Sequence, residues 1–305
     1  MDRGLGTRPD GMLRITLLEG QARALMAETT GLCDRAREIH SLSRTATAAL
    51  GRLLTGSVMM GWMLKGPKDS VTVSVRGNGP LGAMLAVGRP DGAVKGYVGH
   101  PGVELPLKNG KLDVGGGVGA DGELAVIKDM GLREPYMGRV KLVSGELAED
   151  LAMYFVQSEQ TPSLVSLGVL TAERVVSAGG LIVQPLPGCS EAALRSLELS
   201  APMFGDISAT MLAWGLDGAV GQLLGHLQPV VTDRAAPAYQ CDCSRDRMER
   251  ALISLGELEL KSMIKEGRDV TLNCHFCGAS HSFTPVQLAE TMTRARPDAP
   301  NRREA

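Results

Sequence analysis

The residues best suited to chemistry in this sequence are four cysteines near the C-terminus. They form two pairs, Cys241 with Cys243 and Cys274 with Cys277, and 30 residues separate the pairs. Thiolates two or three positions apart can point at one centre, and two such pairs give the closed four-thiolate set that Zn2+ prefers in structural sites. The spacing therefore predicts a zinc site formed by all four residues.

Two further cysteines and two nearby histidines are assigned no role. Cys33 lies in an apparent helix among apolar neighbours, which is typical of a buried and inert thiol. Cys189 has neither a partner thiol nor an adjacent base to activate it. His275 and His281 offer nitrogen ligands, but four cysteines already complete a zinc site, so we interpret both as surface imidazoles.

Size and charge limit the class of protein. A chain of 305 residues with 44% hydrophobic content is long enough for two domains and a real core. Its net charge of −2 gives no reason to expect nucleic acid or an anionic membrane as a partner. The N-terminus lacks the apolar stretch of a signal peptide, so we expect a cytoplasmic protein. In that reducing compartment cysteines are more often metal ligands or redox-active thiols than permanent disulfides.

Residues 1–188 are expected to form a mixed α+β (α/β) core domain. Helical spacing covers 29–64, as one long helix or two, and 145–157, with Ser144 as the N-cap. Short connections between β-type runs predict one dominant, mainly antiparallel sheet. The runs are 71–75, 83–87, 94–98 and 124–127, with a further one ending near 186–188.

Two Gly-x-Gly-x-x-Gly strings, beginning at Gly77 and Gly117, have the spacing of a dinucleotide-binding loop. Such a loop must open a helix whose N-terminus binds the pyrophosphate. Here Pro80 and a β-type run follow the first string, and a strand follows the second. We therefore interpret both strings as hairpin turns.

Residues 189–236 are predicted to be a helical linker. Glycines interrupt its helices, which are too short to be very stable alone. The simplest interpretation is a linker packed permanently on its neighbours. The sharper one is an adaptable apolar face that binds client proteins once its cover is removed. The candidate client-binding residues are Leu194, Leu197, Met203, Ile207, Met211, Leu212 and Trp214.

Residues 237–290 are predicted to form the zinc module, and 291–305 a disordered tail rich in arginine and proline. Helices are expected near 246–255 and 257–266, between the cysteine pairs. Six acidic and six basic residues lie there, a balance that argues against a nucleic-acid-binding zinc ribbon. The expected whole is an α+β core, a helical linker and a small C-terminal four-cysteine module.

Several stretches beyond the cysteines agree with one family. They are 251–256 and 259–260 in the module, and 76–82, 143–151, 154–160 and 178–188 in the core. Together they make residues 10–290 similar to the HslO-type family of redox-regulated holdase chaperones, the 33 kDa heat-shock proteins. The chain departs from that family in having His281 where an aromatic residue is expected and Gly278 where asparagine is frequent.

The resemblance implies an ATP-independent chaperone that oxidation activates. It implies that Cys241 then pairs with Cys243 and Cys274 with Cys277, out of three connectivities that four cysteines allow. Loss of zinc would unfold the module and the linker, which would then hold unfolded or aggregation-prone proteins. The resemblance also implies a homodimer in the oxidised state. We expect no enzymatic activity.

Two alternatives remain. The first is a thiol-disulfide oxidoreductase using Cys274 and Cys277, which would turn over in an insulin-reduction assay. The second is a constitutive protein- or RNA-binding protein whose zinc is purely structural, as most four-cysteine sites are. Release of zinc by an oxidant, with the protein staying in solution, would separate a redox switch from a structural site.

Overall fold

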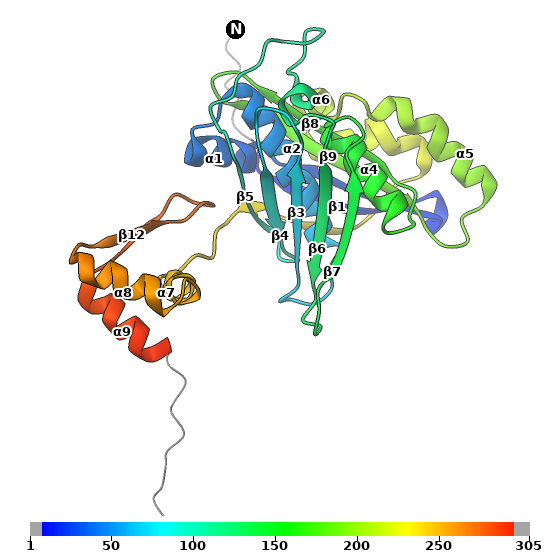
Figure 1. Ribbon diagram of the computed structural model, residues 1–305. Coiled ribbons are helices and arrows are strands. Elements are labelled where there is room, and N and C mark those ends of the chain that lie inside the picture. The colour runs from blue at the N-terminus through cyan, green and yellow to red at the C-terminus, as the bar shows by residue number, and fades with distance from the viewer. Residues whose placement is uncertain (1–7, 296–305) are drawn as a thin grey trace, which may run out of the picture. The chain divides into compact units, whose positions relative to one another are not determined.

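The computed structural model describes residues 8–295, which fold as two compact units that divide between Gln240 and Cys241 (Figure 1). The first unit contains two large sheets and the helices that cover them, and the second is a small module of helices and one hairpin. The mixed α+β fold with antiparallel sheets is confirmed. The expectation of one dominant sheet is wrong, because helices separate the strands into two sheets.

The first sheet is antiparallel throughout, with the strand order β10-β1-β2-β9-β8 among the described residues. Its strands are β1 (Gly11–Leu17), β2 (Ala22–Glu28), β8 (Leu164–Thr171), β9 (Val175–Pro185) and β10 (Val230–Ala235). The turn η1 (Leu18–Gly20) joins β1 to β2. Helices cover both faces of this sheet, so nearly every residue of its interior strand β9 is buried.

The second sheet has the order β11-β5-β4-β3-β6-β7, and only the short β11 pairs in parallel among its described strands. The strands are β3 (Ser70–Arg76), β4 (Met84–Gly88), β5 (Ala93–Val98), β6 (Glu123–Asp129), β7 (Tyr136–Lys141) and β11 (Ala238–Tyr239). Val71, Val73 and Val75 of β3 are buried, whereas Thr72 and Ser74 between them are half-exposed. This alternation is typical of a sheet that packs on the core with one face.

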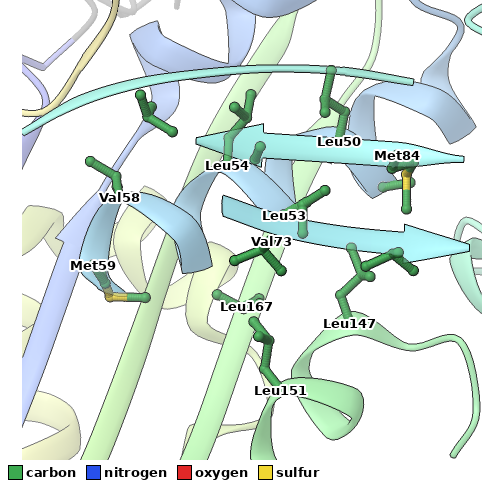
Figure 2. Close-up of a cluster of buried hydrophobic side chains, with 14 of the residues drawn as sticks. Leu50, Leu53, Leu54, Val58, Met59, Val73, Met84, Leu147, Leu151 and Leu167 are labelled. Carbon is green, nitrogen blue, oxygen red and sulfur yellow. The ribbon is translucent and has the colours of Figure 1, made fainter. Parts of the chain in front are cut away.

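The core lies around α2 (Arg44–Trp62), which packs between the two sheets (Figure 2). All of its residues except Arg44 and Arg52 are buried. The predicted helical stretch 29–64 is in fact two helices, α1 (Thr30–His40) and α2, because Ser41 takes a left-handed conformation between them. Side chains from both sheets and from α4 (Leu147–Gln157) meet α2: Val73, Met84, Leu147, Leu151 and Leu167.

The two glycine strings pack against each other. The first is the connection between β3 and β4, as predicted, but the second starts inside the short helix α3 (Val114–Val118), so its interpretation as a hairpin turn is wrong. The amide of Leu81 donates to the carbonyl oxygen of Gly117 at 2.9 Å. A Cβ atom on Gly79 would lie 2.4 Å from that same oxygen, so the close backbone approach requires glycine.

The predicted N-cap of α4 is also wrong. The helix starts at Leu147 with Glu146 as its N-cap residue, two positions after Ser144. The Ser144 hydroxyl instead accepts a hydrogen bond from the amide of Glu146 at 3.2 Å, which orders the turn before the helix. The carboxylate of Asp150 accepts from the amide of Val143 at 2.7 Å and fixes the same turn from inside the helix.

The linker helices cover the outer face of the first sheet. They are α5 (Glu191–Ser200), η2 (Ala201–Phe204), α6 (Ile207–Ala219), the π-helical turn η3 (Val220–Leu224) and η4 (Gly225–Leu227). Their buried side chains form one apolar cluster with Leu13, Ile15 and Leu17 of β1. The chain then returns to the sheets as β10 and β11. None of the helices in the described residues combines the length and apolar content that a membrane span requires.

The second unit contains α7 (Arg245–Ser254), α8 (Glu257–Glu266), β12 (Val270–Asn273), β13 (Ser280–Phe283) and α9 (Pro285–Ala295). The two helices predicted between the cysteine pairs are confirmed. Helix α9 reaches into the predicted disordered tail, because Thr291 and Met292 pack inward one turn after the buried Leu288. Residues 296–305 of that tail lie outside the described residues.

Candidate metal centre

Two chain segments bring the four cysteines together. Cys241 and Cys243 lie just before α7, and Cys274 and Cys277 lie in the turn of the hairpin between β12 and β13. Helices α7 and α8 lie between the two segments in the sequence. The pairs are therefore neighbours in space although 30 residues separate them in sequence.

The four sulfur atoms form one cluster. Their Sγ atoms all lie within 4.8 Å of one another. The Sγ atoms of Cys241 and Cys274 are 3.7 Å apart, and those of Cys243 and Cys277 are 3.3 Å apart. Four sulfurs bound to one Zn2+ ion would lie about 3.8 Å apart, given Zn–S bonds of about 2.3 Å. The donor set and its spacing therefore fit zinc.

The hairpin turn has the backbone needed to present two sulfurs. The amide of Gly278 donates to the carbonyl oxygen of Cys274 at 2.8 Å, and the amide of Cys274 donates to Ala279 at 2.9 Å. Gly278 has φ of +70°, the left-handed region that glycine and asparagine tolerate best. The departure from the family at this position therefore keeps the required backbone conformation.

The thiols differ in how readily they ionise. Burial, with Cys274 close by, raises the pKa of Cys241 to about 11. Burial and the neighbouring sulfurs also raise the pKa of Cys243. Burial works against ionisation of Cys274 too, but the amides of Phe276 and Cys277 donate to its sulfur and lower its pKa. Amides directed at a sulfur favour a thiolate, the form that binds metal.

Contacts around the cluster hold α7 in place. Asp242, between the first two cysteines, forms an ion pair with Arg247 at 2.6 Å. The guanidinium of Arg245 lies 4.3 Å from the ring centroid of Phe283 and donates to the carbonyl oxygen of Ser282 at 2.9 Å. These contacts connect the first cysteine segment to β13.

The remaining cysteines and histidines lie apart from the cluster. Cys33 is buried 3.6 Å from the carbonyl oxygen of Gly51, and burial raises its pKa to about 12, as suits an inert thiol. Cys189 is half-buried. His275 is exposed, but His281 is only half-exposed, so the interpretation of His281 as a surface imidazole is wrong. Neither histidine belongs to the metal-binding group found in the described residues.

The structure divides the candidate client-binding residues into two sets. Leu197, Ile207 and Met211 are buried against the first sheet. The other four are exposed: Leu194 (37%), Met203 (48%), Leu212 (37%) and Trp214 (58%). Sequence reasoning missed Leu199, the most exposed leucine of this segment at 81%. Its place two positions after the buried Leu197, on the opposite side of α5, was the available signal.

A two-sheet α+β unit followed by a small four-cysteine module defines the class of protein to which this chain belongs. The family model described as Hsp33 protein matches residues 10–284. The 33 kDa chaperonin of Alkaliphilus metalliredigens is 44% identical over 282 residues, which cover 91% of this chain and 96% of the relative. That of Thermoanaerobacter sp. is 42% identical over 287 residues, or 93% and 98% of the two chains.

A solved structure agrees. The crystal structure of the 33 kDa chaperonin (heat shock protein 33 homolog) from Thermotoga maritima is similar with a TM-score of 0.85 and 35% sequence identity. The similarity covers 94% of this chain and 99% of that one. The chain therefore belongs to the Hsp33 family, and the resemblance inferred from the sequence is confirmed.

Proposed function

We propose that this protein is an ATP-independent holdase chaperone that oxidation of its four-cysteine centre activates. Membership of a family whose relatives are named chaperonins supports the chaperone activity. The single observation that carries the switch is the sulfur cluster, in which Cys241, Cys243, Cys274 and Cys277 converge within 4.8 Å. In the reduced protein these residues would hold Zn2+, which when bound keeps all four thiols ionised and ties the two ends of the module together.

Oxidation would remove the ligands in pairs. An oxidant such as peroxide accepts two electrons from each pair of thiols, forming a Cys241–Cys243 and a Cys274–Cys277 disulfide and two molecules of water per disulfide. The sulfur contacts of 3.7 Å and 3.3 Å join cysteines of different pairs. The proposed pairing therefore rests on the family resemblance and on the chain, because residues two or three positions apart meet most often once the module loosens.

The module depends on its metal because its own core is small. Among the described residues, its fully buried apolar side chains are Leu252, Leu260, Phe283 and Leu288. A structural zinc site contributes about 10–16 kcal/mol to folding at neutral pH, more than such a core supplies. Losing the thiolates would therefore unfold the module.

Unfolding of the module would then loosen the linker helices. Its exposed Met203, Leu212 and Trp214 lie beside the buried Ile207 and Met211, so loosening α6 would extend an apolar surface that is already present. We propose this surface, together with Leu194 and Leu197, as a binding site for unfolded or aggregation-prone proteins. We also propose that the oxidised form is a homodimer and that the protein acts in the cytoplasm without enzymatic activity.

The test uses one preparation before and after peroxide at mildly elevated temperature. Zinc content and suppression of thermal aggregation of an unrelated protein are measured together. The proposal predicts that zinc leaves as activity appears, and that dithiothreitol with added Zn2+ reverses both. If zinc stays bound, or leaves without activity, the site is structural and the switch is rejected. Turnover in an insulin-reduction assay would instead indicate an oxidoreductase.

A further inference from the structure

We propose that the edge of strand β1 is a binding site for extended segments of unfolded polypeptide. Strand β10 covers this edge in the closed protein, and a client would replace β10 by adding its own strand to the first sheet. The proposal rests on the proposed function for the event that removes β10. It adds a second mode of client binding, through main-chain hydrogen bonds rather than apolar side chains.

Strand β1 has the properties of an interior strand. Met12 is buried in the core around α2, and Leu13, Ile15 and Leu17 are buried under the linker helices. Its one charged residue, Arg14, does not protect the edge. The Arg14 guanidinium donates to the carbonyl oxygen of Trp62 at 2.9 Å and lies 4.7 Å from the Trp62 ring centroid.

Such a strand is hazardous when its edge is free. Long apolar strands without proline or outward charges pair readily with other chains, and proteins normally cover or interrupt them. In β1 only β10 provides this cover on the side away from β2. Removing β10 would therefore create a template for strand addition.

The side chains of strand β10, which covers this edge, are mostly exposed. Its first five residues are all exposed, including Val230 and Val231. Its register with β1 shifts opposite Arg14 and Ile15, which interrupts the ladder. The Thr232 hydroxyl donates to the carbonyl oxygen of Arg14 at 3.1 Å, and beyond the edge Arg234 forms an ion pair with Asp217 of α6 at 2.7 Å and Ala235 packs on the core around α2. The backbone pairing of residues 230–233 is the part of this cover that any extended chain can provide.

The chain on either side keeps β10 in place. The linker helices precede it. Two residues after its end, β11 pairs with β5, and the Tyr239 hydroxyl donates to the carbonyl oxygen of Gly96 at 2.7 Å. Cys241 follows directly in the sequence. Loosening of the linker would free the chain before β10, and unfolding of the cysteine module would leave the two-residue strand β11 as the sole support after it. An exposed edge strand gains too little from its own hydrogen bonds to stay ordered alone.

The chemistry of this edge selects unfolded polypeptide as the occupant. Strand addition uses main-chain donors and acceptors, which every client has whatever its sequence. The side chains of the added strand would face solvent, as those of β10 do, so the site imposes little side-chain selectivity. A second copy of this chain, exchanging its own β10, is the competing occupant.

Hydrogen exchange read by mass spectrometry tests the proposal on the full chain. Those amides of residues 12–16 that donate to β10 rather than to β2 should exchange at least tenfold faster after peroxide treatment and regain protection when reduced, carboxymethylated α-lactalbumin is added as an unfolded client. Amides that stay protected through oxidation, in protein that has released zinc and gained holdase activity, would overturn the edge site and leave the proposed function intact. Renewed protection without client, with a rise in molecular mass, would identify self-exchange and also overturn it.

A second variant makes the test independent of oxidation. Successive amides of a strand alternate between partner and solvent, so Val230→Pro with Val231→Pro removes at least one donor from β10 to β1. The control, Val230→Thr with Val231→Thr, removes the same exposed apolar groups and keeps both donors. The proline variant alone should bind the client with zinc still present and with the same amides of β1 deprotected. Deprotection without client binding, or unchanged protection, would reject the inference even if the oxidative switch itself fails.

Discussion

At the scale of single residues, the cysteine cluster combines thiols of unequal acidity. Cys241 and Cys243 are protonated at neutral pH because burial raises their pKa values, whereas amides directed at Cys274 lower its pKa. Metal binding must therefore displace protons from Cys241 and Cys243, whereas Cys274 ionises more readily than either. This asymmetry has consequences for both mutation and pH.

Replacing Cys274 should disable the site. Cys274→Ser removes one thiolate, and the loss of a mere outer contact already costs about 10–100-fold in metal affinity. We expect zinc affinity to fall by more than about 100-fold, with holdase activity under reducing conditions. Competition with a chromogenic chelator and an aggregation assay measure the two effects. Cys189→Ser is the matched control; a Cys274→Ser protein that stays zinc-loaded and inactive would contradict the switch.

Zinc binding should release protons. Because the pKa of Cys241 is about 11 and that of Cys243 is also raised, each must lose a proton when the ion binds near pH 7. Apparent affinity should therefore rise with pH between about 6 and about 8. Calorimetry in buffers of different ionisation enthalpy measures the release. An affinity that is constant or falls over this range would show that the cysteines are already ionised without metal.

At the scale of elements, helix α6 is interrupted at Gly215. Gly215 has φ of 67° and ψ of −178°, a conformation open almost only to glycine. Two charged side chains hydrogen-bond to the backbone at the two helix ends that this interruption creates. Arg8 donates to the carbonyl oxygen of Met211 at 2.8 Å, and the Glu28 carboxylate accepts from the amide of Leu216 at 3.1 Å. The linker is thus fastened to β2 and to the segment before β1 at this break.

A side chain at the break should loosen the linker. Gly215→Ala imposes a strained backbone that costs about 1–3 kcal/mol, and its Cβ would lie 3.3 Å from Arg8. We expect the amides of residues 207–219 to exchange faster, by the factor that this loss of free energy implies. We also expect client binding to begin at a lower oxidant dose. Gly221→Ala is the control, because no atom lies within 4 Å of its Cβ position and its φ is not positive. Equal effects in both variants would reject a special role for the break.

At the scale of the whole molecule, the two units differ in what stabilises them. The first has a continuous apolar core between two sheets, whereas the second has a small cluster and the four-cysteine centre. If zinc stabilises the second unit as proposed, that unit can unfold while the first stays folded. This difference in stability is the physical basis of the proposed switch.

Metal removal should therefore unfold only the second unit. A chelator added under reducing conditions should deprotect the amides of 241–295, while those of β3, β4 and β9 keep their protection. Hydrogen exchange with mass spectrometry resolves the two units, and restoring Zn2+ provides the control. A module that stays protected without metal would mean that its apolar cluster suffices, which would remove the physical reason for activation.

Local features were predictable because neighbouring residues alone specify them. The spacing of Cys241, Cys243, Cys274 and Cys277 predicted the cluster, since short intervals restrict where two sulfurs can point. Periodicity and turn residues predicted α7, α8 and the β-type runs of the second sheet, where one buried face gives an alternating pattern. Residues 13–17 carry the same alternation, with Leu13, Ile15 and Leu17 buried and Arg14 and Thr16 half-exposed, yet no element was predicted there. Residues 22–28 carry no alternation, because six of the seven residues of β2 are buried.

Long-range pairing was decided only by the tertiary structure. Sequence pattern could not separate the strands into two sheets, because the separation depends on α2 packing between them. Nor could it show that Gly79 meets Gly117 or that β10 covers the edge of β1. Thus the sequence by itself determined the chemistry of the centre and most local elements. Packing between distant segments determined which surfaces are covered, because burial depends on the partner and not on the segment alone.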